Sequence, residues 1–280
     1  MAVSASKTIL SANASSTTSG RLQAAFRDMS LAFSMRELWL FLGWRDVQKH
    51  YRRSVLGPLW LTLSMGVIVG GMGVLYSQIF QIDPEQYLPF LAVGFIVWGM
   101  IGGALNAACT VFSSASHAIR QIRLPLMVYI FQFTWSQFIT FSHNFIIYFL
   151  VILYFGINPG IGAFMAIPGL LVLVINVVFA AMILGPLCAR FRDMPMIVGS
   201  IVQVLFFLTP VIWNADQLPD RAFFVHFNPF YHFLEIVRAP LLGGSATWFN
   251  WGAVLGITLF MGVFATLFFA RYRARIAYWA

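Results

Sequence analysis

The chain has 280 residues, of which 60% are hydrophobic and only 9% are charged, with a formal net charge of +8. A soluble domain carries about 25% charged residues, so this composition excludes an ordinary soluble protein. The apolar residues fall into long uncharged blocks, and a block of about 20 such residues is typical of a transmembrane helix. We therefore expect an all-α polytopic membrane protein, whose positive charge marks the side its loops face and not nucleic-acid binding.

Residues 1–20 are rich in Ser, Ala and Thr without any periodicity, which predicts a disordered tail. Residues 21–56 are predicted to form cytoplasmic or interfacial helices, because charged and apolar residues alternate there with a helical period. The basic residues that share one helical face are Arg45, Lys49, Arg52 and Arg53. The apolar residues on the opposite face are Leu40, Trp44, Val47 and Tyr51.

A helix with one basic and one apolar face lies in the plane of a membrane interface. Two roles fit the basic face. It either anchors the chain on anionic lipid, or it also binds a phosphate-bearing substrate headgroup, because arginine binds phosphate through two parallel hydrogen bonds. Gly57 and Pro58 then end this helix and turn the chain into the first apolar run.

Residues 57–270 are predicted to form a domain of six transmembrane helices. The six uncharged runs are Leu56–Phe80, Leu88–Phe112, Leu126–Phe155, Ile161–Leu187, Met194–Trp213 and Trp248–Ala270. At about 1.5 Å per residue each run can cross a hydrocarbon core about 30 Å thick, the fifth only just. Basic residues precede the first run, follow the second, fourth and sixth, and form a basic tail at residues 271–280. The positive-inside rule therefore predicts that both termini are cytoplasmic.

Residues 114–125, between the second and third runs, are predicted to form a short amphipathic helix. Ser116, or alternatively Ser113 or Ser114, is the candidate N-cap, and Pro125 is the stop signal. Ile119 and Ile122 are expected on one side of this segment, flanked by Arg120 and Arg123. Such a helix either transmits force from a soluble partner or is part of an ordinary cytoplasmic loop.

Residues 214–247 contain two apolar stretches, each too short to span a membrane, separated by Asn228 and Pro229. We expect a re-entrant helical hairpin that dips into the outer leaflet, with Pro229 in the first turn of its second helix. The alternative is a plain external loop.

The apolar runs contain no Asp, Glu, Lys or Arg, which argues against proton- or ion-coupled transport. The third and fifth runs nevertheless carry a polar and aromatic set, namely Phe131, Gln137, Thr140, Asn144, Tyr148, Gln203 and Phe207. These residues either join helices by hydrogen bonds or line an uncharged conduit along which a sugar polymer slides. The sequence contains no phosphate-binding loop, metalloprotease motif, nucleophile elbow or paired carboxylates, so we expect no catalytic residue, metal or cofactor in this chain.

Four stretches together resemble the permease subunit of ABC-2 type exporters, in the branch that exports polysaccharides such as O-antigen. They are YRRSVLGPLW, IRQIRLP, ARFRDMPMIVGSIVQVLFFLTPVIW and NPFYHFLEIVRAPLL, which begin at residues 51, 119, 189 and 228. The third stretch is the most specific of the four. The resemblance covers nearly the whole chain after residue 35.

The resemblance implies a type V exporter-like permease fold in the bacterial inner membrane, with Ser116–Leu124 as the coupling helix and Pro219–Leu242 as the outer gate. It implies a homodimer beneath which two copies of a separate P-loop ATPase dock, with ATP and Mg²⁺ held by the ATPase. The substrate implied is a glycan linked to undecaprenyl diphosphate, as in lipopolysaccharide biosynthesis. The phosphates would then be bound by the basic face that begins at Arg45. The aromatic residues assigned to the outer gate are Trp213, Phe223, Phe224, Phe227, Phe230 and Tyr231.

Two other functions compete with polysaccharide export. An ABC-2 exporter of a lipid, a drug or teichoic acid would have a lipid-like cavity in place of a continuous aromatic path. A membrane-embedded glycosyl- or phosphotransferase would need acidic residues within or beside the membrane, and the apolar runs contain none.

Overall fold

The computed structural model describes residues 18–50, 57, 59–215 and 223–280. Arg52, Arg53 and Tyr51 therefore lie outside the described residues, as does most of the predicted tail. Every regular element within the described residues is a helix. These elements are α2 (Thr18–Ser34), α3 (Arg36–His50), α4 (Leu59–Phe80), α5 (Pro84–Ala108), α6 (Ser116–Gln121), α7 (Leu126–Phe155), η1 (Ile161–Met165), α8 (Ala166–Arg190), α9 (Met194–Leu208), α10 (Phe223–Phe227), α11 (Pro229–Leu241) and α12 (Trp248–Trp279).

Within the described residues, five helices are long and apolar enough to cross a membrane: α4, α5, α7, α8 with its leading 3₁₀ turn, and α12. The fifth apolar run forms a shorter helix, because α9 has 15 residues and ends at Leu208. Thr209 is already extended, with ψ 134°, since the residue before a proline is disfavoured in the helical region. At about 1.5 Å per residue α9 is about 22 Å long, which is shorter than a hydrocarbon core. The expectation of six full-length spanning helices is therefore not met by α9.

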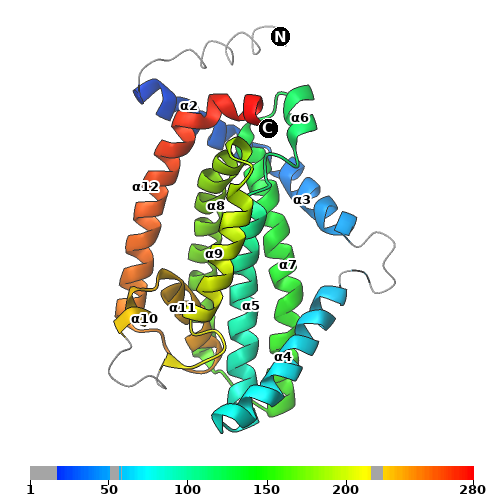
Figure 1. The fold of residues 1–280 in the computed structure, drawn as a ribbon, viewed down its shortest axis with the longest axis vertical. Coiled ribbons are helices and arrows are strands. Elements are labelled where there is room, and N and C mark those ends of the chain that lie inside the picture. The colour runs from blue at the N-terminus through cyan, green and yellow to red at the C-terminus, as the bar shows by residue number, and fades with distance from the viewer. Residues whose placement is uncertain (1–17, 51–56, 58, 216–222) are drawn as a thin grey trace.

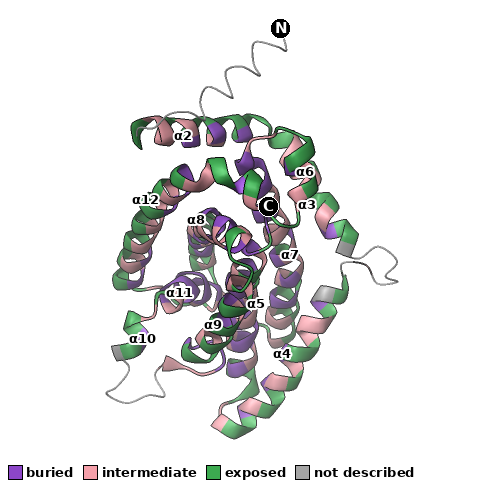
Figure 2. Ribbon diagram, turned by 45° about the horizontal axis from the view of Figure 1, so that its top comes forward, coloured by how far each residue is buried: buried purple, intermediate pink, exposed green. Residues whose placement is uncertain are grey.

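Helix α5 lies at the centre of the bundle and packs against α4, α7, α8, α9 and α11 (Figure 1). Helices α4 and α12 lie at the edge and bury few of their residues, whereas buried residues gather around α5, α7 and α11 (Figure 2). Close backbone approach at Gly94 supports this arrangement, because a Cβ there would lie 2.8 Å from the carbonyl oxygen of Val211. The segment after α9 thus passes directly against α5.

The two ends of the bundle differ in what covers them (Figure 1). Helices α2 and α6 and the last turns of α12 lie together at one end, and α10 and α11 lie toward the other. The basic segment predicted as a tail at residues 271–280 is helical as far as Trp279 and continues α12. Its last turns bend across the end of the bundle, next to α2.

Helices α6 and α11 begin in different ways. At α11, Asn228 is the N-cap, its side-chain oxygen accepts a hydrogen bond from the backbone N–H of Phe230, and Pro229 occupies the first turn, as expected. At α6, the N-cap is Ala115, which offers no side-chain hydrogen bond. The prediction that a serine caps α6 is therefore wrong, because the hydroxyls of Ser113 and Ser114 donate to carbonyls of the preceding turn.

Candidate functional site

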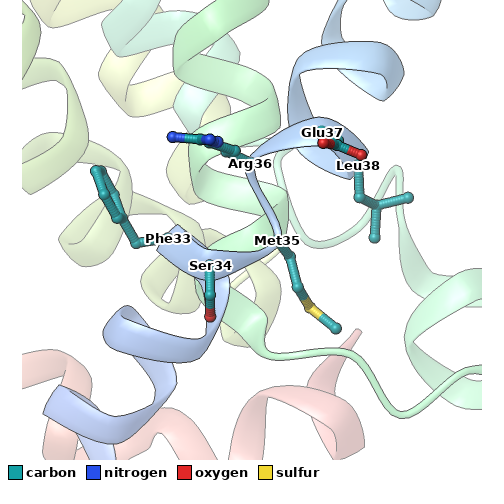
Figure 3. A pocket seen from close by; sticks show the side chains of 6 residues that line it. All are labelled: Phe33, Ser34, Met35, Arg36, Glu37 and Leu38. Atoms are coloured by element: carbon teal, nitrogen blue, oxygen red, sulfur yellow. The ribbon is translucent and has the colours of Figure 1, made fainter.

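Helices α2 and α3 meet at an elbow on the surface of the bundle. A hollow of about 610 Å³ lies against this elbow and is lined by the six consecutive residues from Phe33 to Leu38 (Figure 3). The side chain of Arg36 extends away from those of Glu37 and Leu38, so the charged groups do not converge in the hollow. The elbow changes the direction of the chain between the two helices.

Helix α3 is docked firmly on α7. A Cβ at Gly43 would lie 2.8 Å from the carbonyl oxygen of Gln132, so only glycine allows this approach without displacement. The amide of Gln132 also donates a hydrogen bond to the carboxylate of Asp46. The rings of Trp39 and Phe131 lie 5.7 Å apart. These contacts hold α3 against the protein along the half of α7 that follows α6.

The predicted basic face is described only in part. Arg45 is exposed and its guanidinium lies 5.7 Å from the ring centre of Phe41. Lys49 is exposed and forms an ion pair of 2.9 Å with Asp46. Arg52 and Arg53 lie outside the described residues, so phosphate binding by the whole face stays a prediction.

The short helix α6 has one apolar residue directed into the protein and one directed outward. Ile119 is buried in the main core, whereas Ile122, just after the helix, is 54% exposed. Arg120 donates a hydrogen bond of 2.9 Å to the carbonyl oxygen of Ala280, which ties α6 to the end of α12. Arg123 is exposed, and Ser116 is the first residue of the helix. The helix is therefore fixed on one side and open to a partner on the other.

Asp28 joins three helices at this end. Its carboxylate accepts hydrogen bonds from the backbone N–H groups of Leu126 (3.3 Å) and Met127 (3.1 Å), at the start of α7. It also pairs with Arg273 of α12 at 3.1 Å. Burial raises the pKa of Asp28 above its ordinary value, while the charge of Arg273 and these hydrogen bonds oppose the rise. The carboxylate thus caps α7 and fixes α2 and α12 beside it.

The predicted conduit residues fall into two different environments. On α7, Asn144 and Tyr148 are buried, and the hydroxyl of Tyr148 donates a hydrogen bond of 2.8 Å to the carbonyl oxygen of Leu241 on α11. The residues Gln137, Thr140 and Phe131 are half-buried. On α9, Gln203 is exposed and Phe207 is 62% exposed. The role of this set as a channel lining stays a prediction.

The residues assigned to the outer gate form an aromatic group around α10 and α11. Trp213 donates a hydrogen bond of 3.1 Å to the carbonyl oxygen of Phe207, and its ring lies 6.4 Å from that of Phe224. Phe230 packs in an edge-to-face contact with Trp98 of α5 at 5.9 Å. The remaining members are Phe227, which is largely exposed, Tyr231, which contacts His226, and Phe223, which begins α10.

Two buried polar residues fix the end of the bundle toward which α10 and α11 lie. The guanidinium of Arg238 lies 4.1 Å from the ring centre of Phe90, pairs with Glu235, and donates a hydrogen bond of 2.7 Å to the carbonyl oxygen of Pro210. The imidazole of His232 contacts the side chain of Asn250 at 2.9 Å and the carbonyl oxygen of His226 at 2.8 Å. Helix α11 is thereby joined to α5, α10, α12 and the segment after α9.

Residues 37–242 match the family model described as ABC-2 type transporter. The chain belongs to this family. Members of the ABC-2 family are transmembrane permease subunits and not enzymes, and the five long apolar helices agree with a membrane protein.

The ABC-2 match is accompanied by similarity to O-antigen export permeases. One such protein of Klebsiella pneumoniae is 19% identical over 227 residues, which cover 80% of this chain and 85% of the relative. A second from the same organism is 19% identical over 221 residues, covering 78% and 84%. One from Myxococcus xanthus is 24% identical over 208 residues, covering 70% and 77%. All three are named O-antigen export system permease protein RfbA.

The most connected polar residues of this ABC-2 permease were not among those that the sequence singled out. Asp28 is one of few acidic residues in the chain, and apart from Arg27 its sequence neighbours are mostly apolar, which is a usable signal for a buried charge. Glu235 and Arg238 lie three positions apart on one helix face, and that spacing predicts an ion pair. Neither pattern indicates the partners on α7, α12 or α5, because those lie far away in the sequence.

Proposed function

We propose that this chain is the transmembrane subunit of an ATP-driven exporter that moves a lipid-linked, O-antigen-like polysaccharide across the bacterial inner membrane. Two copies would form the channel, and two copies of a separate P-loop ATPase would bind the end that carries α6. Both chain termini would then be cytoplasmic, since α2 and the end of α12 lie at that same end. Helix α9 and the extended residues after it would complete the sixth crossing.

The observation that carries this proposal is the position of α6 in a chain of the ABC-2 family. A short helix held between two spanning helices, with Ile119 buried and Ile122 exposed, transmits a push on its outer side to the bundle. The bond from Arg120 to Ala280 and the cap from Asp28 extend that rigid connection to α12 and α2. An ATPase that docks on α6 would therefore move three helices together.

The substrate assignment rests on the relatives and on the surface chemistry. All three relatives reported above are O-antigen export permeases. The exposed Arg45 and Lys49, with Arg52 and Arg53, supply guanidinium and ammonium groups that suit a lipid diphosphate at the membrane interface. The uncharged polar and aromatic side chains of α7 and α9 suit a glycan that must slide without being held.

The test is reconstitution of the full chain into lipid vesicles, alone and with its cognate P-loop ATPase. We expect no ATP hydrolysis by the chain alone, and ATP-dependent passage of lipid-linked glycan by the complex. Ile122→Asp should abolish the stimulation of the ATPase and the export, because it places a charge on the exposed side of α6. The control is Ile161→Asp, at a position that is 86% exposed in the turn between α7 and α8.

Glycan that stays on its original side in the presence of ATP and both subunits would refute polysaccharide export. Passage of a free lipid or drug in its place would assign the chain to another branch of the ABC-2 family. Equal effects of the Ile122 and Ile161 variants would refute the coupling role of α6.

A further inference from the structure

A cavity of about 500 Å³ lies where α2, the segment that follows α6 and the end of α12 meet. Four arginines line it, namely Arg27, Arg120, Arg123 and Arg273. Asp28 is the one carboxylate of its described lining. Three helices that are far apart in the sequence thus place a net positive charge around one space.

The charge of this cavity is only partly compensated by the protein. Asp28 is engaged by Arg273 and by two backbone N–H groups of α7, and Arg120 donates to a backbone carbonyl. Within the described part of the chain, the guanidinium groups of Arg27 and Arg123 form no ion pair or hydrogen bond. The Nε of Arg273 is buried and also lacks a hydrogen-bond partner there. A buried donor without an acceptor costs about 1–3 kcal/mol, so the cavity is suited to an anion that supplies acceptors.

The walls between the arginines are apolar. Leu31, Leu124 and Leu126 line the cavity, together with Ile122, which is 54% exposed. A small soluble anion gains nothing from the apolar walls. An anionic phospholipid supplies a phosphate to the arginines and acyl chains to the apolar side chains. Basic pockets between helices at the end of a membrane domain bind anionic phospholipid headgroups.

We propose that this cavity binds the phosphate of an anionic phospholipid, with Arg27 and Arg123 as its principal ligands and Arg273 as a third donor. The planar guanidinium groups supply paired hydrogen bonds to the phosphate oxygens. The bound headgroup bridges α2, the segment after α6 and α12, and so sets the position of α6 relative to the bundle. This inference goes beyond the proposed export function and does not rest on it, because it requires only the cavity and a membrane.

The test is native mass spectrometry of the full purified chain in a non-ionic detergent, titrated with phosphatidylglycerol and, separately, with phosphatidylcholine. We expect the wild-type chain to retain phosphatidylglycerol in preference to phosphatidylcholine. The double variant Arg27→Gln, Arg123→Gln should bind phosphatidylglycerol about 30-fold more weakly, given about fivefold for each basic residue. The matched control is Arg192→Gln, Arg275→Gln, which removes the same charge at exposed positions outside the cavity and should change affinity by less than about threefold.

A thermal unfolding measurement accompanies each variant. Because Arg27 and Arg123 have no hydrogen-bond partner among the described residues, their replacement should leave the unfolding temperature in phosphate-free detergent unchanged. If the double variant does not fold, Arg123→Lys keeps the charge but removes the paired hydrogen bonds, and it should still weaken phosphatidylglycerol binding.

Three results would overturn the inference. Unchanged phosphatidylglycerol binding by the double variant, or by Arg123→Lys where that variant is the one tested, would show that the cavity is not the site. Equal loss in the control would reduce the effect to general electrostatic attraction. Displacement of phosphatidylglycerol by a polyprenyl diphosphate at much lower concentration, or by inorganic phosphate alone, would assign the cavity to the carrier lipid or to a free anion.

Discussion

The guanidinium Nη2 of Arg273 lies 3.1 Å from the carboxylate Oδ1 of Asp28 and joins α12 to α2 across 245 positions of the sequence. The same carboxylate caps the first turn of α7 through Leu126 and Met127. One side chain thus fixes α2, the segment that follows α6 and the end of α12. Any movement of α6 that is transmitted to α7 must either move Asp28 and its partners together or break the hydrogen bonds between them.

Asp28→Ala removes the shared carboxylate and leaves both N–H groups and Arg273 without their acceptor. Breaking one partner of a buried charge pair costs about 3–5 kcal/mol, so we expect a clear fall in the unfolding temperature of the purified chain in detergent. Asp193→Ala is the matched control, because Asp193 is exposed and its side chain caps nothing at the start of α9. An Asp28→Ala variant as stable as this control would show that the junction does not hold the helices.

The pH dependence of stability follows from the same residue. Burial raises the pKa of Asp28 above 3.8, so the folded state binds its proton more tightly than the unfolded state does. The stability that this group contributes is complete below pH 3.8 and is lost as the pH rises through the folded pKa.

Asp28→Asn keeps the size of the side chain but removes this titration. We expect the difference in unfolding temperature, wild type minus variant, to shift in favour of the wild type as the pH falls from neutral towards 3.8. Thermal unfolding in detergent at a series of pH values measures it. A difference that moves the opposite way on acidification would mean that Arg273 outweighs burial.

The docking of α3 on α7 depends on Gly43. In Gly43→Ala the new Cβ would lie 2.8 Å from the backbone oxygen of Gln132, which cannot rotate away, so α3 must shift. We expect a loss of about 1–3 kcal/mol in stability. Gly66→Ala on α4 is the control, because nothing lies within 4 Å of its built Cβ and alanine is the better helix former. Protease sensitivity of residues 18–50 and the unfolding temperature together report the shift, and equal behaviour of the two variants would argue against close docking.

The spans and the amphipathic segments could be predicted from the sequence because each depends on local composition. Long uncharged runs located the five long helices of the described residues, Leu126–Phe155 to the residue and each of the others with at least one end displaced by several residues. The Asn228–Pro229 pair located the start of α11. The length of α9 was overestimated, because hydrophobicity continues to Trp213 while Pro210 ends the helical conformation at Leu208. The apolar run and the helical conformation therefore end at different residues in this segment.

The candidate site was predictable only where its residues lie close together in the chain. Ile119 and Ile122 were found from their spacing on one short segment, and the structure separates them into a buried and an exposed residue. The cavity lined by Arg27, Arg123 and Arg273 was not predicted, because three distant segments contribute to it. The periodicity of one helix does not indicate which other helix packs against it.

Asn144 tests whether the polar stripe of α7 serves packing or transport. Its Oδ1 is buried and has no hydrogen-bond partner in the described part of the chain. Asn144→Leu removes that unsatisfied oxygen with little change in volume, so we expect stability to be unchanged or higher by about 1 kcal/mol. The matched control is Asn176→Leu on α8, which breaks a hydrogen bond of 2.7 Å to Thr258 of α12 and should cost about 0.6 kcal/mol.

Export by the reconstituted complex separates the two roles of the stripe. If Asn144 contacts the glycan as the channel opens, Asn144→Leu should slow export severalfold while its unfolding temperature stays at or above that of the wild type. Asn176→Leu should show the reverse, with lower stability and nearly normal export per folded complex. Normal export by Asn144→Leu would show that the glycan does not depend on this amide, and the polar stripe would then serve helix packing alone.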